Sequence, residues 1–279
     1  MDKLSTLIFS GLMSVASSSA NAITIDFNYD FDGGFFSGVN ESRRTTLNAA
    51  GSYFETKLND NLTAITSAGS NSFNAIFDRP DTGQITTLNN YSVAANTLVV
   101  FVGGQALPGS TLGEGGPGGY SASTFQQSFL DNLETRGQGS ENVDFGPWGG
   151  TLSFDTGTSW YFDLDVNTID PALSGINDFY SVAIHELAHV LGYGTSNTWN
   201  SIHPGTSHWA KNTMSLVKGI PQEAAMDPTL TTGTRKYFTD LDLQGLSAIG
   251  WEVSAVPVPA AFYLLGSAMI GLTAFRRKT

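Results

Sequence analysis

The chain has 279 residues, enough for one sizeable domain or two small ones, and its formal net charge is −12. Because the body of the chain contains no basic run, nucleic acid is not expected as a partner. The chain has no cysteine, which excludes disulfides, thiolate metal ligands and a cysteine nucleophile. Any metal ion must therefore be held by histidine or carboxylate side chains.

The first 22 residues have the pattern of a secretory signal peptide. Lys3 precedes an apolar run over residues 4–15, and an A-x-A cleavage site ends at Ala22. We therefore expect residues 1–22 to be removed on export and the folded domain to cover residues 23–254. A buried N-terminal helix is the alternative.

The first part of the folded domain shows both helix and strand patterns. Apolar residues at helical spacing predict a helix over residues 40–59. Alternating or β-branched runs predict strands at residues 23–29, 62–68, 72–77 and 97–102. The last of these runs is almost continuously apolar, which is typical of a central strand covered on both faces.

Residues 103–119 are the most glycine-rich stretch of the chain. They hold eight glycines and two prolines, which predicts an irregular surface loop. A helix is expected next, over residues 121–136. A short strand with alternating polarity is then predicted at residues 149–154.

Several oxygen-bearing side chains follow this strand. Such side chains are the ligands of structural calcium sites. They lack the spacing of an EF-hand, so a solvated loop is the favoured interpretation and a calcium site is the alternative. The residues concerned are Asp163, Asp165, Asn167, Asp170 and Asp178.

Residues 181–194 contain the motif H-E-x-x-H, formed by His185, Glu186 and His189. In a helix, residues four apart share a face, so both imidazoles can reach one ion. A catalytic zinc site has three protein ligands and an open position for a water, whose pKa the ion lowers to about 7. Glu186 would take the proton of that water as general base. All four histidines lie between residues 185 and 208, which argues against chance pairing.

The residues after this helix decide the third ligand. Gly192 would let the helix end and the chain turn back. In the common metzincin pattern, H-E-x-x-H-x-x-G-x-x-H, the third histidine lies three residues beyond that glycine, where this chain has Thr195. Two histidines remain as candidates, His203 and His208.

Two further segments carry a family resemblance. Ser207-His208-Trp209 and Ala225-Met226-Asp227-Pro228 resemble the leishmanolysin-like metzincin zinc proteases. In those enzymes an insertion precedes a third ligand in an H-W pair, and a methionine turn lies beneath the metal. The resemblance assigns the third ligand to His208, with His203 as the alternative. Residues 239–251 resemble the C-terminal helix of many metzincins, with Asp240 in its N-cap region.

The resemblance covers residues 145–253 and implies an α+β fold. The expected architecture is a twisted mixed sheet, an active-site helix above a cleft and a small irregular C-terminal subdomain. In metzincins an edge strand ahead of the helix binds the substrate backbone as an added strand. Residues 149–154 are the candidate for this role, and a plain hairpin is the alternative.

The expected function is that of a monomeric zinc metalloendopeptidase acting on protein or peptide substrates. His185, His189 and His208 would hold the ion, and Glu186 would be the catalytic residue. The alternative is a catalytically inactive protein of the same fold in the cell surface or biofilm matrix. The intact Glu186 favours the enzyme, because a purely structural zinc site has no need of it.

The end of the chain has three parts. Residues 256–259 read V-P-V-P, an apolar run covers residues 260–275, and Arg276-Arg277-Lys278 follow. This tail resembles the PEP-CTERM sorting signals of Gram-negative bacteria, which a membrane exosortase recognises and cuts. It implies that residues 255–279 engage the inner membrane and an exosortase-type enzyme, leaving the domain secreted or on the cell surface. An ordinary C-terminal membrane anchor is the alternative.

Overall fold

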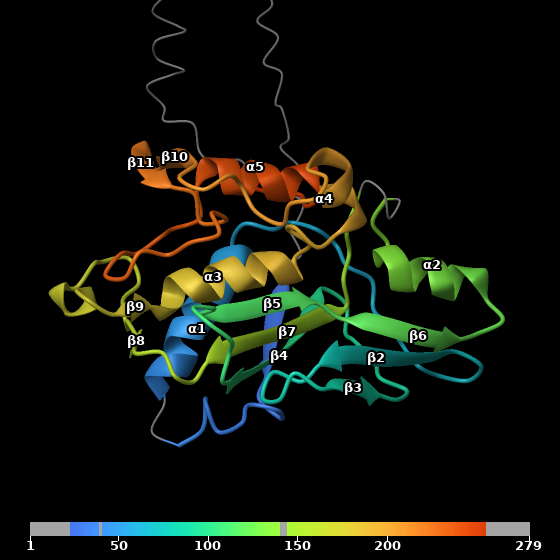
Figure 1. The fold of residues 1–279 in the computed structure, drawn as a ribbon. Helices are drawn as coiled ribbons and strands as arrows, with labels where there is room; N and C mark the ends of the chain where they lie inside the picture. The colour runs from blue at the N-terminus through green and yellow to red at the C-terminus, as the bar shows by residue number, and fades with distance from the viewer. Residues whose placement is uncertain (1–22, 39–40, 140–143, 255–279) are drawn as a thin grey trace, which may run out of the picture.

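The computed structural model describes residues 23–38, 41–139 and 144–254, which form a mixed α+β architecture (Figure 1). The expected signal peptide and the expected sorting tail lie outside the described residues, so both remain predictions. Within the described ranges, no helix is long and apolar enough to cross a membrane.

The central sheet is twisted and mixed, with the strand order β1-β4-β7-β5 (Figure 1). β1 (Thr24–Asn28), β4 (Thr97–Gln105) and β7 (Gly149–Asp155) are parallel, whereas β5 (Gly113–Pro117) runs antiparallel to β7. β4 is buried along almost its whole length, as its continuous apolar run predicts for a central strand.

Two helices cover one face of the central sheet. They are α1 (Glu41–Glu55) and α3 (Phe179–Val190). Their apolar side chains, such as Leu47 and Ile184, share one core with Leu152 of β7. This packing holds the helix that carries H-E-x-x-H directly against the sheet.

The other face packs against a second, antiparallel sheet with the order β3-β2-β6. Its strands are β2 (Ser72–Asp78), β3 (Ile85–Leu88) and β6 (Gly119–Ser123). The ring of Phe77 on β2 stacks on that of Phe101 on β4, with 4.2 Å between centroids. Helix α2 follows β6, and its residues Phe129 and Leu133 belong to the same core. It spans Gln127–Thr135.

The chain after α3 lies on the opposite side of that helix from the sheet (Figure 1). It contains α4 (Asn197–Ile202), the hairpin of β10 (Met214–Val217) and β11 (Ile220–Glu223), and α5 (Asp240–Ala248). The expected C-terminal helix is thus present, although its N-cap is Thr239 rather than Asp240. Between β7 and α3 lie β8 (Trp160–Tyr161), the 3-10 turn η1 (Pro171–Leu173) and β9 (Asn177–Asp178).

The prediction of the edge strand is wrong. Residues 149–154 form β7, but β7 lies between β4 and β5 and has no free edge. The edge strand is β5, inside the segment 103–119 for which the glycine content predicted a loop. Glycine is required there because α3 packs directly on the strand. A Cβ at Gly115 would collide with the backbone oxygen of Glu186, and one at Gly113 would lie 2.8 Å from Val182.

Two smaller expectations also differ from the structure. Residues 62–68 form no strand and make only two isolated bridges, Ile65 with Val93 and Ala68 with Asn71. Residues 119–123 pair with β2 as β6, so the helix expected from residue 121 begins only at Gln127. In both places tertiary pairing, which local periodicity does not record, decided the conformation.

Candidate metal centre and cleft

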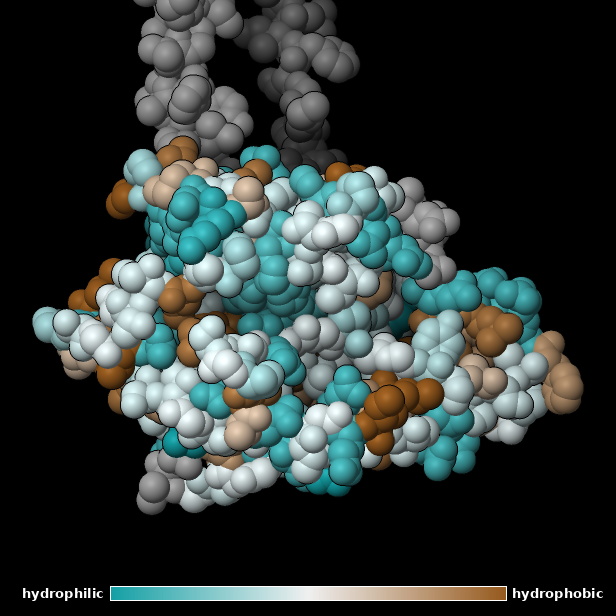
Figure 2. Space-filling view, in the orientation of Figure 1, coloured by the Kyte–Doolittle hydropathy of each residue, from teal (hydrophilic) through white to brown (hydrophobic). Residues whose placement is uncertain are grey.

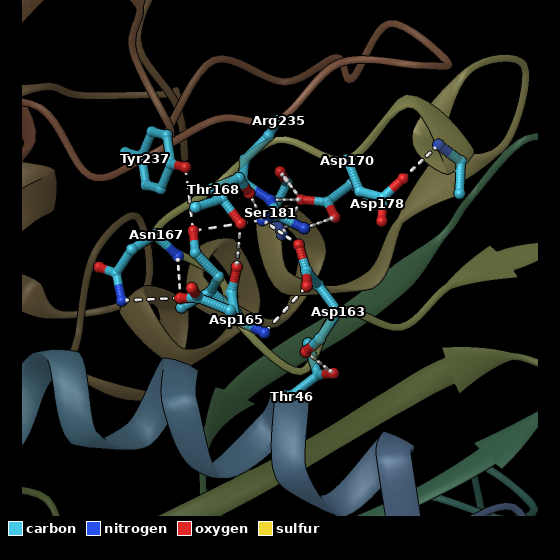
Figure 3. Close-up of polar contacts among 12 residues, drawn as sticks. Thr46, Asp163, Asp165, Asn167, Thr168, Asp170, Asp178, Ser181, Arg235 and Tyr237 are labelled. Carbon is cyan, nitrogen blue, oxygen red and sulfur yellow. Dashed lines mark hydrogen bonds and ion pairs between the residues drawn. The ribbon is translucent and has the colours of Figure 1, made fainter.

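Helix α3 begins at a buried polar network, drawn in Figure 3. Asp178 caps the helix, and its carboxylate accepts hydrogen bonds from the backbone N–H of Ser181 at 3.1 Å and from the Ser181 hydroxyl at 2.6 Å. Arg235 donates to both oxygens of Asp178 and, at 2.7 Å, to Asp163. The network therefore anchors the first turn of α3 to the segment that precedes α5.

The solvated loop favoured from the sequence is confirmed for Asp165, Asn167 and Asp170, which are exposed, and is wrong for the other two residues. Asp163 and Asp178 are buried and face the guanidinium of Arg235 rather than water. Asp165 accepts hydrogen bonds from Asn167 (Figure 3). Asp170 accepts one from the backbone of Ala172, at the start of the 3-10 turn. The guanidinium of Arg235 thus supplies the positive charge beside Asp163 and Asp178, for which calcium was the alternative predicted from the sequence.

The structure brings His185, His189 and His208 together. The Nε2 atom of His208 lies 3.0 Å from that of His185 and 3.1 Å from that of His189, and the latter two are 3.2 Å apart. Two nitrogens on a tetrahedral zinc ion, each at 2.0–2.1 Å from it, lie about 3.3 Å apart. The trio therefore fits one zinc ion. Within the described ranges, no other group of three or more histidine or carboxylate side chains is close enough to share an ion.

Each histidine of this trio has a hydrogen-bond partner at its other ring nitrogen. The Nδ1 of His185 lies 2.7 Å from the carbonyl oxygen of Ala225, and that of His189 lies 2.6 Å from the carbonyl oxygen of Tyr193. A carbonyl can only accept, so both rings carry their proton on Nδ1 and leave the Nε2 lone pair free for a metal. The Nδ1 of His208 lies 3.0 Å from the hydroxyl of Ser207.

The histidines are also held neutral, which is the form that binds a metal. Burial is the largest cause in each case. It lowers the pKa of His189 to about 4 and that of His185 well below its ordinary value. Burial likewise lowers the pKa of His208, against the opposing charge of Asp227.

His203, the alternative third ligand, lies elsewhere. It ends α4, and its ring packs on the rings of Trp199 and Trp209 at centroid distances of 4.7 and 4.9 Å. The three histidines that converge are thus the three assigned from the sequence. The aromatic stack holds Trp209 in place and, with it, the adjacent His208.

Glu186 lies on α3 between the two motif histidines and is 7% exposed. Burial and, to a smaller extent, the charge of Glu114 raise the pKa of Glu186 to about 8, against a hydrogen bond from the backbone N–H of Gly115 that lowers it. Both neighbours belong to β5. The candidate catalytic carboxylate therefore lies in contact with the edge strand of the sheet.

A cleft of about 580 Å³ opens beside the three histidines. One wall is residues 110–115, leading into and along β5, and the opposite wall is residues 227–230 with Lys236. Figure 2 shows hydrophilic residues gathered in the middle of this face, between the C-terminal segment and the sheet. The cleft is open along β5, whose other edge pairs with β7.

Sequence reasoning missed a buried carboxylate that supports this centre. Asp242 accepts hydrogen bonds from the backbone N–H groups of Ala225 and Met226 and from the indole of Trp209, at 2.8, 3.2 and 3.0 Å. It also bonds the backbone and hydroxyl of Thr239, which form a capping box for α5. The spacing of Thr239 and Asp242 predicts the capping box but not the contacts with the other segment.

Met226, expected in a turn beneath the metal, is wholly buried in the main core. Its carbonyl oxygen accepts a hydrogen bond from the backbone N–H of Trp209 at 3.0 Å. The segment around Met226 thus contacts the His208 segment directly, and through Ala225 it contacts His185.

Comparison of the chain with models of protein families, with curated proteins and with solved structures gave no match.

Proposed function

We propose that this protein is a zinc-dependent endopeptidase with a metzincin-like arrangement, in which His185, His189 and His208 hold the ion. One observation carries the proposal. Three neutral imidazoles converge at 3.0–3.2 Å beside a buried carboxylate and an open strand edge. A zinc ion bound there supplies Lewis acidity and lowers the pKa of water to about 7.

Glu186 is proposed as the catalytic residue. Its carboxylate accepts the proton of the attacking water and delivers it to the leaving amine, so one group serves as base and then as acid. The N–H of Gly115 holds this carboxylate from the side of β5. A purely structural metal site would gain nothing from a buried carboxylate in this place.

The free edge of β5 supports a peptide as the substrate. An extended peptide can add a strand to an exposed sheet edge, with backbone hydrogen bonds supplying affinity. β5 is such an edge within the described part of the chain, and it forms one wall of the cleft next to Glu186. The role expected for residues 149–154 is thus proposed for β5 instead.

The test is cleavage of an unfolded protein such as casein by the zinc-loaded protein, compared with Glu186→Ala. Glu134→Ala, an exposed change on α2, is the matched control. We expect cleavage by the wild type and by the control, and a loss of at least about 100-fold in Glu186→Ala with zinc content unchanged.

The other outcomes separate the alternatives. One zinc ion bound without cleavage of any protein would favour an inactive surface or matrix protein. Absence of tight zinc binding would refute the site itself.

A further inference from the structure

A second cavity, of about 480 Å³, lies on the side of β5 that faces away from α3. Its walls are the end of β2 and the turn towards β3 on one side, and β5 and β7 on the other. Glu114 and Gly115 line both this cavity and the cleft beside the histidines. The two hollows therefore lie on opposite faces of one strand.

Strand alternation places the Glu114 side chain on the face of this second cavity. Positions 113 and 115 face α3, since a Cβ at either would meet Val182 or Glu186. Successive side chains of a strand point to opposite faces, so Glu114 points away from α3. Its cross-strand partner Ser153 confirms this direction, because the Ser153 hydroxyl donates to the carbonyl of Pro80 in the wall of the second cavity.

The register also shows which backbone groups of β5 do not bond to β7. Asp155 donates to Leu112, and Gly118 donates to Gly149, which makes the even-numbered residues of β5 the hydrogen-bonded partners of β7. The backbone groups of residues 113 and 115 therefore point away from β7, towards the open edge, where the N–H of Gly115 donates to the Glu186 carboxylate. A peptide strand paired there would place one residue directly opposite Glu114.

Cross-strand neighbours share a face of the sheet. The substrate residue opposite Glu114 would thus send its side chain into the second cavity, while its neighbours face α3. A Cβ at either glycine that flanks Glu114 would meet Glu186, so Glu114 lies next to the candidate catalytic carboxylate. The substrate residue opposite Glu114 therefore lies within two positions of the bond that is cleaved.

The charged residues that line the second cavity indicate which class of substrate side chain it would bind. Glu114 is exposed and has no ion-pair partner among the described residues, and the exposed Asp78 lines the same cavity. The one cation in the lining, Arg79, is already held by Asp81 through two hydrogen bonds of 3.0 and 2.7 Å. The cavity therefore offers a carboxylate with no cation of its own to satisfy it.

The geometry points to a specificity subsite in which Glu114 binds a lysine or arginine side chain of the substrate. This inference rests on the proposed peptidase function and adds the substrate class. The overall acidity of the protein acts in the same direction, because it attracts cationic peptides to the cleft.

The experiment begins with cleavage of a mixed peptide library by the zinc-loaded protein, read by mass spectrometry. We expect lysine and arginine to be enriched at one position within two residues of the cleaved bond. Two peptides differing only by lysine or glutamine at that position are then compared. For the wild type, kcat/KM should be about 2- to 5-fold higher with lysine, as expected for an ion pair with an exposed carboxylate.

In Glu114→Gln this ratio should fall close to one, and in Glu114→Lys the library preference should shift to aspartate and glutamate. Glu134→Gln, on the exposed surface of α2, should keep the wild-type ratio. Zinc content and circular dichroism check that each variant is folded.

The outcomes separate the two proposals. Cleavage without a cationic preference, or with one that persists in both Glu114 variants, overturns the subsite and leaves the peptidase standing. Absence of cleavage of every peptide by the wild type overturns both.

Discussion

Asp242 offers the sharpest test of how the metal centre is supported. Its carboxylate is wholly buried and accepts five hydrogen bonds, which link Trp209, the Ala225–Met226 segment and the start of α5. We predict that Asp242→Ala lowers the free energy of unfolding by about 3–5 kcal/mol. It should also weaken zinc binding, because the displaced segments carry His208 and the carbonyl that orients His185.

The magnitude follows from the donors left behind. Burial raises the pKa of Asp242, so the carboxylate itself is costly to keep in the core, and alanine removes that cost. Five buried donors then lose their acceptor, at about 1–3 kcal/mol for each that finds no other partner. The free energy lost with these hydrogen bonds exceeds the free energy gained by removing the buried carboxylate. For zinc, loss of an outer-shell support typically costs about 10- to 100-fold in affinity.

Two further variants test whether the loss comes from the hydrogen bonds that the Asp242 carboxylate accepts. Asp242→Asn keeps the shape but places an NH₂ group where Oδ2 now meets the N–H groups of Ala225 and Thr239, so it should be nearly as harmful as alanine. Asp240→Asn, in the same first turn of α5, loses only a favourable interaction with the helix dipole, about 0.3–1 kcal/mol.

Urea unfolding with excess zinc and zinc titration against a chelator would measure both effects. If the Asp242 variants match Asp240→Asn in stability and zinc affinity, Asp242 does not support the metal centre.

Three other predictions follow from the contacts. His208→Ala should abolish tight zinc binding, whereas His203→Ala should retain one zinc ion per chain. Equal zinc content in the two variants would contradict His208 as the third ligand. Gly115→Ala should destabilise the fold strongly, because the new Cβ collides with the α3 backbone, whereas Gly116→Ala, with open space around it, should be nearly neutral in thermal unfolding. Burial raises the pKa of Asp60 to about 6, although the backbone N–H of Glu252 lowers it. Because the unfolded pKa is about 3.9, this burial costs stability as pH rises from 4 to 6. Asp60→Asn should therefore raise stability by about 1–3 kcal/mol at pH 7 and not below pH 4; a gain that is the same at both pH values would argue against this origin.

Local patterns in the chain were sufficient for the helix that carries the motif. The four-residue spacing of His185 and His189 requires only helical periodicity to place both rings on one face. The apolar run 97–102 likewise needs no partner to be identified as a buried strand, since its composition excludes an exposed face. The chain has only four histidines, which limited the third ligand to two residues, and the resemblance to a known family selected His208.

The tertiary structure decided the features that depend on contacts between distant segments. Gly113 and Gly115 look like loop residues because glycine weakens an isolated strand, yet the close approach of α3 makes glycine necessary at the sheet edge. Asp163 looks solvated until Arg235, 72 residues away, is folded against it. Asp242 shows only a helix cap in the sequence, because its bonds to the ligand-bearing segments exist only once α5 packs beside them. Periodicity indicates which face of a helix or strand is apolar, but it does not indicate which other segment packs against that face.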